Sequence, residues 1–191
     1  SSISWDDPNF PNIEGFGVWA AKCNFTMGPD GKMYSRMLGG NLVRIDVENA
    51  RGENLTNGDL VGTKDGSAYG LVFDPQDENV FYFSNNDKHC IYKYDLRTKE
   101  CACWAGQEGK SGYLDGPIGQ AMFNKPGQMC VDSEGNIILT DTENHCIRKI
   151  TMSTGYVSTL AGKPQNSGYV NGSAEDAQFK KPLGICIDND D

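Results

Sequence analysis

The chain contains only two histidines, His89 and His145, and each begins the same triplet, His-Cys-Ile. The triplets are 56 residues apart (145 − 89), and each follows a polar stretch, NNDK in one case and DTEN in the other. Histidine and cysteine are common zinc ligands, and histidine is also the most frequent general base of enzymes. Two hypotheses follow: the triplets are halves of a metal or catalytic site, or they are one structural turn made twice.

The remaining residues support the structural turn more than a metal or a catalytic triad. A zinc ion shared by His89 and His145 requires both rings within about 2 Å of it, too close for two separate repeat units. No G-x-S-x-G sequence suggests a serine nucleophile beside either histidine. Asp132 and Asp188 end two short apolar runs and could bind calcium, but Asp before a turn is ordinary turn chemistry. We expect no cofactor, with a calcium ion as the alternative.

The seven cysteines are an odd number, so at least one thiol lacks an intrachain disulfide partner. Cys90 and Cys146 are 56 residues apart, as are Cys130 and Cys186, and the C-x-x-C spacing is absent. Cysteines that recur at a fixed period resemble small core hydrophobes more than metal ligands or disulfide partners. We therefore expect most of them to be buried thiols.

A repeat of 56 residues extends well beyond the histidines. GYLDGPIGQAMFNKP (112–126) aligns with GYVNGSAEDAQFKKP (168–182), and the two segments share seven residues. FSNNDKHCIYKY (83–94) likewise aligns with LTDTENHCIRKI (139–150), and a weaker copy includes NLVRID from residue 41. A period in this range is typical of stacked or radial repeat architectures.

The clearest unit predicts four short strands, at residues 128–132, 137–141, 146–150 and 156–162. Polar turns of four or five residues separate them, as an antiparallel meander requires. A linker of about 18 residues then leads to the next unit, and its Ala177 and Phe179 correspond to Ala121 and Phe123 one repeat earlier. We expect these pairs to anchor a turn of helix against the sheet. Four-stranded sheets in series bury both faces when they pack around a ring, which predicts an all-β fold, a β-propeller.

Residues 115–162 closely resemble an NHL repeat, which is named for its Asn-His-Leu signature. The signature here reads Asn144, His145, Cys146, whereas residues 88–90 read Lys-His-Cys and the first unit keeps only Asn-Leu at 41–42. The resemblance covers residues 20 to 191 and implies a six-bladed β-propeller of four-stranded antiparallel blades. At about 56 residues per blade the chain holds about 3.4 blades, so we expect further domains and further blades in a longer protein.

The expected organisation follows from the repeat. A leader, residues 1–19, is a linker or a segment that closes the ring, and the blades occupy residues 20–191. Within that range we place the blades at 20–63, 67–107 and 125–163, with the start of the next blade at 181–191.

In such a ring the turns between second and third strands and the linkers between blades emerge on one face. Loops on such a face vary while the sheets stay fixed, so binding sites gather there. The candidate ligand-binding residues on this face are Asp87, His89, Tyr113, Glu143, His145 and Tyr169. A purely structural role in the turns is the alternative for the histidines and their acidic neighbours. In that interpretation Asp141 and Asn85 cap the turns, and Arg148 lies within reach of a carboxylate.

The pattern favours a non-catalytic binding scaffold that presents these loops to a protein or glycan ligand. The alternative is a metal-dependent propeller hydrolase or lyase with a divalent ion in the central channel, which rests on analogy with other six-bladed propellers. With 17 basic and 26 acidic residues the net charge is −9, which disfavours binding to nucleic acid. No apolar run is long enough to span a membrane. The linker type resembles bacterial NHL repeats, and we expect a bacterial cell envelope or extracellular surface.

Overall fold

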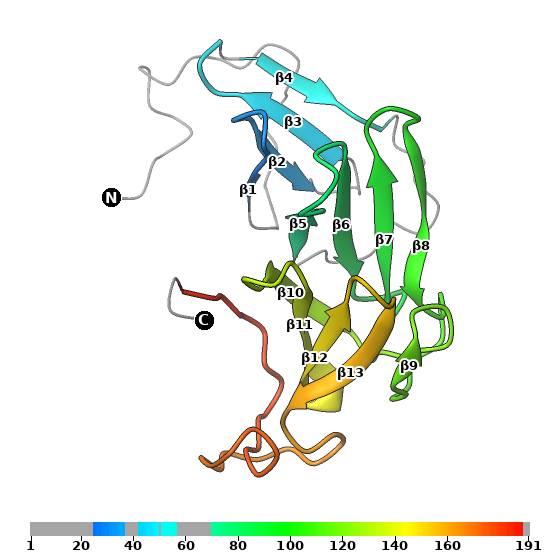
Figure 1. Ribbon diagram of the computed structural model, residues 1–191, viewed down its shortest axis with the longest axis vertical. Helices are drawn as coiled ribbons and strands as arrows, with labels where there is room; N and C mark the ends of the chain where they lie inside the picture. The colour runs from blue at the N-terminus through cyan, green and yellow to red at the C-terminus, as the bar shows by residue number, and fades with distance from the viewer. Residues whose placement is uncertain (1–24, 37–41, 50, 57–69, 189–191) are drawn as a thin grey trace.

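The computed structural model describes residues 25–36, 42–49, 51–56 and 70–188, which form three antiparallel β-sheets (Figure 1). The predicted leader, residues 1–19, lies outside the described residues. The fold class predicted from the repeat is confirmed: the described chain is all-β, and its sheets resemble propeller blades.

We call the sheets blades 1, 2 and 3 in chain order. Blade 1 consists of β1 (Thr26–Met27), β2 (Met33–Arg36), β3 (Leu42–Asp46) and β4 (Arg51–Asn54). Blade 2 consists of β5 (Leu71–Phe73), β6 (Val80–Asn85), β7 (Cys90–Asp95) and β8 (Glu100–Gly106). Blade 3 consists of β10 (Pro126–Val131), β11 (Ile137–Asp141), β12 (Cys146–Thr151) and β13 (Tyr156–Ala161), with a 3-10 turn η1 (Thr142–Asn144) between β11 and β12.

Blade 3 also has a fifth strand that the sequence did not predict, β9 (Gly116–Pro117), which pairs with β13 at the outer edge. The strand comes from the linker between blades 2 and 3. This linker crosses the outer edge of blade 3, where β13 has free backbone hydrogen-bonding groups that a passing segment can pair with. The N–H of Ile118 donates to the carbonyl of Gly155 at 2.9 Å and secures the same crossing.

The two linkers that the structure describes, before and after blade 3, each contain the predicted single turn of helix. The N–H of Ala121 donates to the Pro117 carbonyl, and the N–H of Ala177 donates to the Ser173 carbonyl, each at 2.9 Å. Ala121 and Phe123 are fully buried in the core between blades 2 and 3. The linker is therefore part of the packing between blades rather than a free loop.

The three sheets fan out from their first strands, with β1, β5 and β10 on one side of the molecule and β4, β8 and β9 on the other (Figure 1). Because side chains alternate along a strand, blade 2 packs one face on blade 1 and the other on blade 3. Phe81 and Phe83 join the core with blade 1, whereas Val80 and Tyr82 join the core with blade 3.

Cys90, Cys101, Cys103, Cys146 and Cys186 are free thiols. Cys90 and Cys146 are fully buried, as expected for repeated core thiols, but the other repeated pair is not, because Cys130 is half-buried and Cys186 is exposed. Cys101 and Cys103 are half-buried beside the core of blades 1 and 2. Within the described ranges, no helix is long and apolar enough to cross a membrane.

Candidate functional site on the loop face

His89 and His145 occupy the same position in successive blades. Each ends the turn between second and third strands in the left-handed backbone region, with φ of 56° and 58°. In each case Nδ1 accepts a hydrogen bond at 3.1 Å from a backbone N–H in the next linker, that of Lys125 for His89 and that of Lys181 for His145. The two donors are again one repeat apart, so the histidines are one structural turn made twice.

The same turns contact the linkers through their backbone. The carbonyl of Lys88 accepts a bond from the N–H of Gly109 at 2.8 Å, and one repeat later the carbonyl of Asn144 accepts one from Gln165 at 2.9 Å. These contacts bring the turns and linkers together on one face, as the repeat predicted. We call the surface formed by residues 86–89, 107–125, 142–145 and 163–181 the loop face.

A glycine at the end of the fourth strand in blades 2 and 3 allows this close approach. Gly106 has a φ of 92°, and a side chain there would lie 3.1 Å from the His89 carbonyl and 2.9 Å from the Phe123 ring. Gly162 has a φ of 94° and the corresponding neighbours, the His145 carbonyl and the Phe179 ring, both at 2.9 Å. Only glycine fits this conformation and this space, which explains why the Ala-Gly pair recurs in the sequence.

The acidic candidates lie beside the histidines. Glu143 Oε1 accepts a hydrogen bond from Lys181 Nζ at 2.9 Å. Glu143 and His145 therefore both bind Lys181, one through its side chain and the other through its backbone N–H. Asp87 lies in the turn of His89. Burial, and to a lesser extent the Lys125 charge, lowers the pKa of His89, and the opposing influence of Asp87 is smaller. His89 is therefore a neutral acceptor near pH 7.

The two tyrosine candidates have different surroundings although they are one repeat apart. The hydroxyl of Tyr113 lies 2.7 Å from Thr159 Oγ1, and its ring lies 4.9 Å from the guanidinium carbon of Arg148. Tyr113 is therefore committed to packing against blade 3. Tyr169 is 84% exposed, and its nearest charged group is Lys180 Nζ, 5.9 Å from the ring centroid.

Arg148 is the centre of a buried network beneath the loop face. Its two terminal nitrogens donate to Asp141 Oδ2 at 2.6 Å and to Asp115 Oδ1 at 2.7 Å, and they also donate to the linker carbonyls of Leu114 and Met122. The sequence predicted that Arg148 would reach a carboxylate, but it did not identify Asp115.

The network changes the predicted role of Asp141. We expected this residue to cap its own turn, but no side-chain cap bond to the turn backbone is present at η1. Its carboxylate instead accepts bonds from the Asn144 side chain, from the N–H of Asn124 and from Arg148, each at 2.8 Å or less. Burial raises the pKa of Asp141, and these bonds act in the opposite direction. Asp141 therefore joins the turn to the linker and to the third strand.

Asp132, which follows the first strand of blade 3, serves its own turn. Asp132 Oδ1 accepts the N–H of Asn136 at 2.6 Å, and its other oxygen lies 3.0 Å from Lys149 Nζ. Asp188 is exposed at the end of the described chain. Among the described residues there is no group of three or more His, Cys, Asp or Glu side chains that could hold a metal ion.

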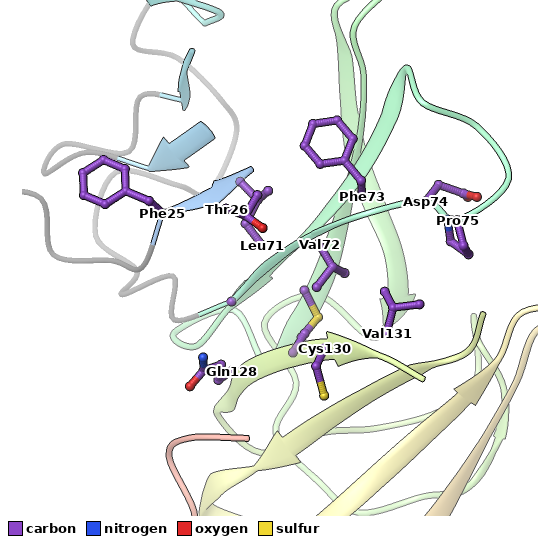
Figure 2. A pocket seen from close by; sticks show the side chains of 12 residues that line it. Phe25, Thr26, Leu71, Val72, Phe73, Asp74, Pro75, Gln128, Cys130 and Val131 are labelled. Carbon is purple, nitrogen blue, oxygen red and sulfur yellow. The ribbon is translucent and has the colours of Figure 1, made fainter. Parts of the chain in front are cut away.

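A pocket that sequence reasoning missed lies near the axis, between the first strands. It has a volume of about 450 Å³ and is lined by Phe25, Thr26, residues 70–75 and residues 128–131. Figure 2 shows Leu71, Val72 and Phe73 on one strand of this pocket and Gln128 on the facing strand. Its only charged lining residue is Asp74, whose carboxylate accepts the Tyr82 hydroxyl at 2.6 Å and the Gln76 N–H at 2.8 Å. No sequence motif marks the pocket, because its lining comes from the ends of separate repeats.

Comparison with known proteins supports the repeat. The sequence profile described as "NHL repeat" matches residues 123–150. A curated relative, NHL repeat-containing protein 2 from Bos taurus, is 29% identical over 104 residues, which are 54% of this chain and 14% of that protein. The chain thus spans about a seventh of that relative's length.

Two solved structures from Bacteroides thetaiotaomicron are also similar. One is a protein of unknown function, with a TM-score of 0.77 and 26% identity, over 85% of this chain and 41% of the other. The second is described as an auxiliary nutrient binding protein, with a TM-score of 0.70 and 27% identity, over 86% of this chain and 42% of the other. The chain therefore spans about two fifths of each.

Proposed function

The chain belongs to the NHL repeat family, and from this premise we propose that it is a non-catalytic binding module whose loop face holds a glycan or a protein ligand. The observation that carries the proposal is the state of the two histidines. In both, Nδ1 accepts a hydrogen bond from a backbone N–H of the next linker. The imidazole rings, which are the side chains best suited to acid–base chemistry, therefore hold the turns against the linkers. The loop face is then a rigid surface that offers contacts rather than a reaction centre.

A glycan is the ligand class that the exposed groups favour. The loop face carries the aromatic rings of Tyr113 and Tyr169, and an aromatic ring with polar neighbours packs well on the apolar face of a sugar. Lys180 beside the second of these rings, and the Glu143–Lys181 ion pair in the adjacent turn, supply hydrogen-bonding groups for hydroxyls. The description of one structural neighbour as a nutrient binding protein agrees with a small polar ligand. A protein ligand is the second outcome that the binding test distinguishes.

The metal-dependent hydrolase or lyase has less support. A divalent ion such as calcium takes six to eight oxygen ligands. The axial pocket provides one carboxylate, Asp74, which already accepts bonds from Tyr82 and from its own turn. We therefore assign the pocket no catalytic ion.

A binding screen with a matched pair of variants tests the proposal. The protein is screened against immobilised glycans and candidate proteins, with calcium and with a chelator. For the ligand found, we expect Tyr169→Ala to weaken Kd about tenfold, a loss of about 1.4 kcal/mol. Tyr156→Ala is the control, because Tyr156 is 47% exposed but lies on the outer strand β13. Equal effects of both variants, or turnover of the ligand that calcium restores after chelation, would overturn the proposal.

Two further expectations belong with this function. We propose that the chain works within a longer protein, as its short coverage of its relatives suggests, and that this protein lies in a bacterial cell envelope or on the cell surface. Sequencing the complete gene and fractionating the source cells test both. A cytosolic fraction containing the protein would contradict the location.

A further inference from the structure

Blade 2 carries two thiols on one face of strands β7 and β8. Cys90 pairs with Gly106 across these strands, and Cys103 pairs with Tyr92. A β-bulge lies between these pairs, because Trp104 is an extra residue that has no partner residue on β7. The extra residue shifts the alternation of side chains, so Cys103 lies on the same face of the sheet as Cys90. Its Sγ lies 3.7 Å from the carbonyl oxygen of Gly106, the residue opposite Cys90. The two sulfur atoms are thus neighbours on adjacent strands.

The two thiols differ in reactivity. The interaction between them lowers the pKa of Cys103 and raises the pKa of Cys90. Cys103 is also half-exposed, whereas Cys90 is fully buried. Because the thiolate is the nucleophile, Cys103 is the thiol that reacts first with an oxidant from solvent. Cys90 is then in place to react with the oxidised sulfur.

We propose that Cys90 and Cys103 form a reversible disulfide when the protein meets a peroxide. The Cys103 thiolate attacks one oxygen of hydrogen peroxide, the O–O bond breaks, and hydroxide leaves while a sulfenic acid forms. The Cys90 sulfur then attacks Cys103 Sγ, the S–O bond breaks, and water leaves. The hydroxide takes up the proton lost by Cys103. Two thiols are oxidised, and the peroxide is reduced to two waters.

The position of this pair gives the bond a consequence. Cys90 directly follows His89, whose ring accepts the Lys125 N–H of the next linker. A cross-link at the start of β7 joins the third and fourth strands of blade 2 directly beneath this turn. The oxidation state of the pair would therefore set the rigidity of the loop face, whichever ligand that face binds.

Two other cysteines serve as internal controls. Cys146 occupies the position of Cys90 in blade 3, but the partner position there is Thr159, so no disulfide can form. Cys101 lies on the same strand as Cys103, but burial raises its pKa to about 12. Burial also raises the pKa of Cys146 to about 12. Neither thiol is expected to react at neutral pH.

Peptide mapping under non-reducing conditions tests the proposal. The protein is treated with hydrogen peroxide, free thiols are alkylated, and the product is digested with trypsin. Cys90 then lies in peptide 89–93, whereas Cys101 and Cys103 share peptide 100–110. We expect a linked product of these two peptides, lighter than their sum by two hydrogens and separated by dithiothreitol. Fragmentation of the linked product from the unmutated protein identifies the bonded sulfur, so this result does not depend on a variant.

Variants sharpen the assignment. Cys101→Ser should keep the linked product, Cys103→Ser should abolish it, and Cys90→Ser should leave a sulfenic acid on Cys103 that dimedone traps. A thermal melt checks that each variant is folded. A bond from Cys90 to Cys101, a bond between Cys101 and Cys103, or complete alkylation of Cys103 after peroxide treatment would each overturn the proposal.

Discussion

Blade 2 presents mainly aromatic rings to blade 1, whereas the strands of blade 3 present aliphatic side chains and one buried arginine to blade 2. In the first interface Phe81 stacks on Tyr94 with ring centroids 5.0 Å apart, and Phe83 stacks on Tyr92 at 5.4 Å. The residues one repeat later, in the second interface, are Ile137, Leu139, Arg148 and Ile150. The strands that carry both sets have the same order and the same pairing direction.

The polar centres of the two interfaces differ in the same way. In blade 2 the hydroxyl of Tyr92 donates to Glu108 at 2.7 Å, and Cys103 lies nearby. In blade 3 the equivalent positions hold Arg148 and Thr159, and the arginine donates to two carboxylates and two linker carbonyls. The comparison shows that the four-stranded form of a blade depends on backbone hydrogen bonds, because every strand has the same N–H and C=O groups to pair. Side chains at a few positions then decide whether the interface is held by packing or by charge.

The largest expected effect comes from breaking the charged interface. Arg148→Met should lower the free energy of unfolding by about 3–5 kcal/mol, because it leaves the fully buried Asp141 without its cationic partner. Chemical denaturation followed by fluorescence measures this loss. Tyr92→Phe at the equivalent position is the control and should cost about 1 kcal/mol, since it removes one hydrogen bond. Equal losses would contradict the comparison.

A double substitution tests whether the two chemistries are interchangeable. Arg148→Tyr alone should be strongly destabilising for the reason given above. Adding Asp141→Asn removes the unpaired carboxylate. Positions 148 and 141 of blade 3 then hold the same residues as the equivalent positions of blade 2, Tyr92 and Asn85. The double variant should be about 1–3 kcal/mol more stable than Arg148→Tyr, and a double-mutant cycle completed with Asp141→Asn alone measures the coupling free energy. Additive effects would mean that Asp141 and Arg148 do not depend on each other.

A smaller and equal effect is expected at the feature that both blades share. His89→Ala and His145→Ala should each cost about 1 kcal/mol, because each removes one hydrogen-bond acceptor for a linker N–H. Asparagine at either position should cost less than alanine, since it keeps an acceptor and tolerates the left-handed backbone. Thermal melts of the four variants provide the test. Alanine variants as stable as the asparagine variants would show that the bond contributes nothing.

The smallest expected effect is a dependence on pH. The pKa of His89 is lowered from 6.5 in the folded protein, so the unfolded chain binds the proton more readily. The stability contributed by the neutral ring is therefore complete above about pH 6.5 and is lost as the pH falls from there towards the folded pKa. His89→Asn should remove this part of the acid destabilisation. Denaturation curves between pH 7.5 and about 5 measure it, and identical slopes for both proteins would contradict it.

The repeat made most of the fold predictable. Strands β11 and β12 begin at the predicted residues, 137 and 146, because polar turns leave few alternatives for such short apolar runs. The reach of Arg148 to a carboxylate was also predictable, since the alternation of side chains along a strand places it near the end of the preceding strand. Strand β9, the partner Asp115 and the axial pocket were not, because each depends on segments that meet only when the linker folds back.

The sequence alone determined that the chain repeats and that each repeat is a small antiparallel sheet, and it favoured one recurrent turn at the two His-Cys triplets. These are local properties, set by the alternation of apolar residues and by turn residues at a fixed period. Only the tertiary structure decided what those turns do. The acceptor role of His89 and His145, the burial of Arg148 and the closeness of Cys90 to Cys103 depend on distances between separate strands and linkers. A one-dimensional pattern does not contain such distances.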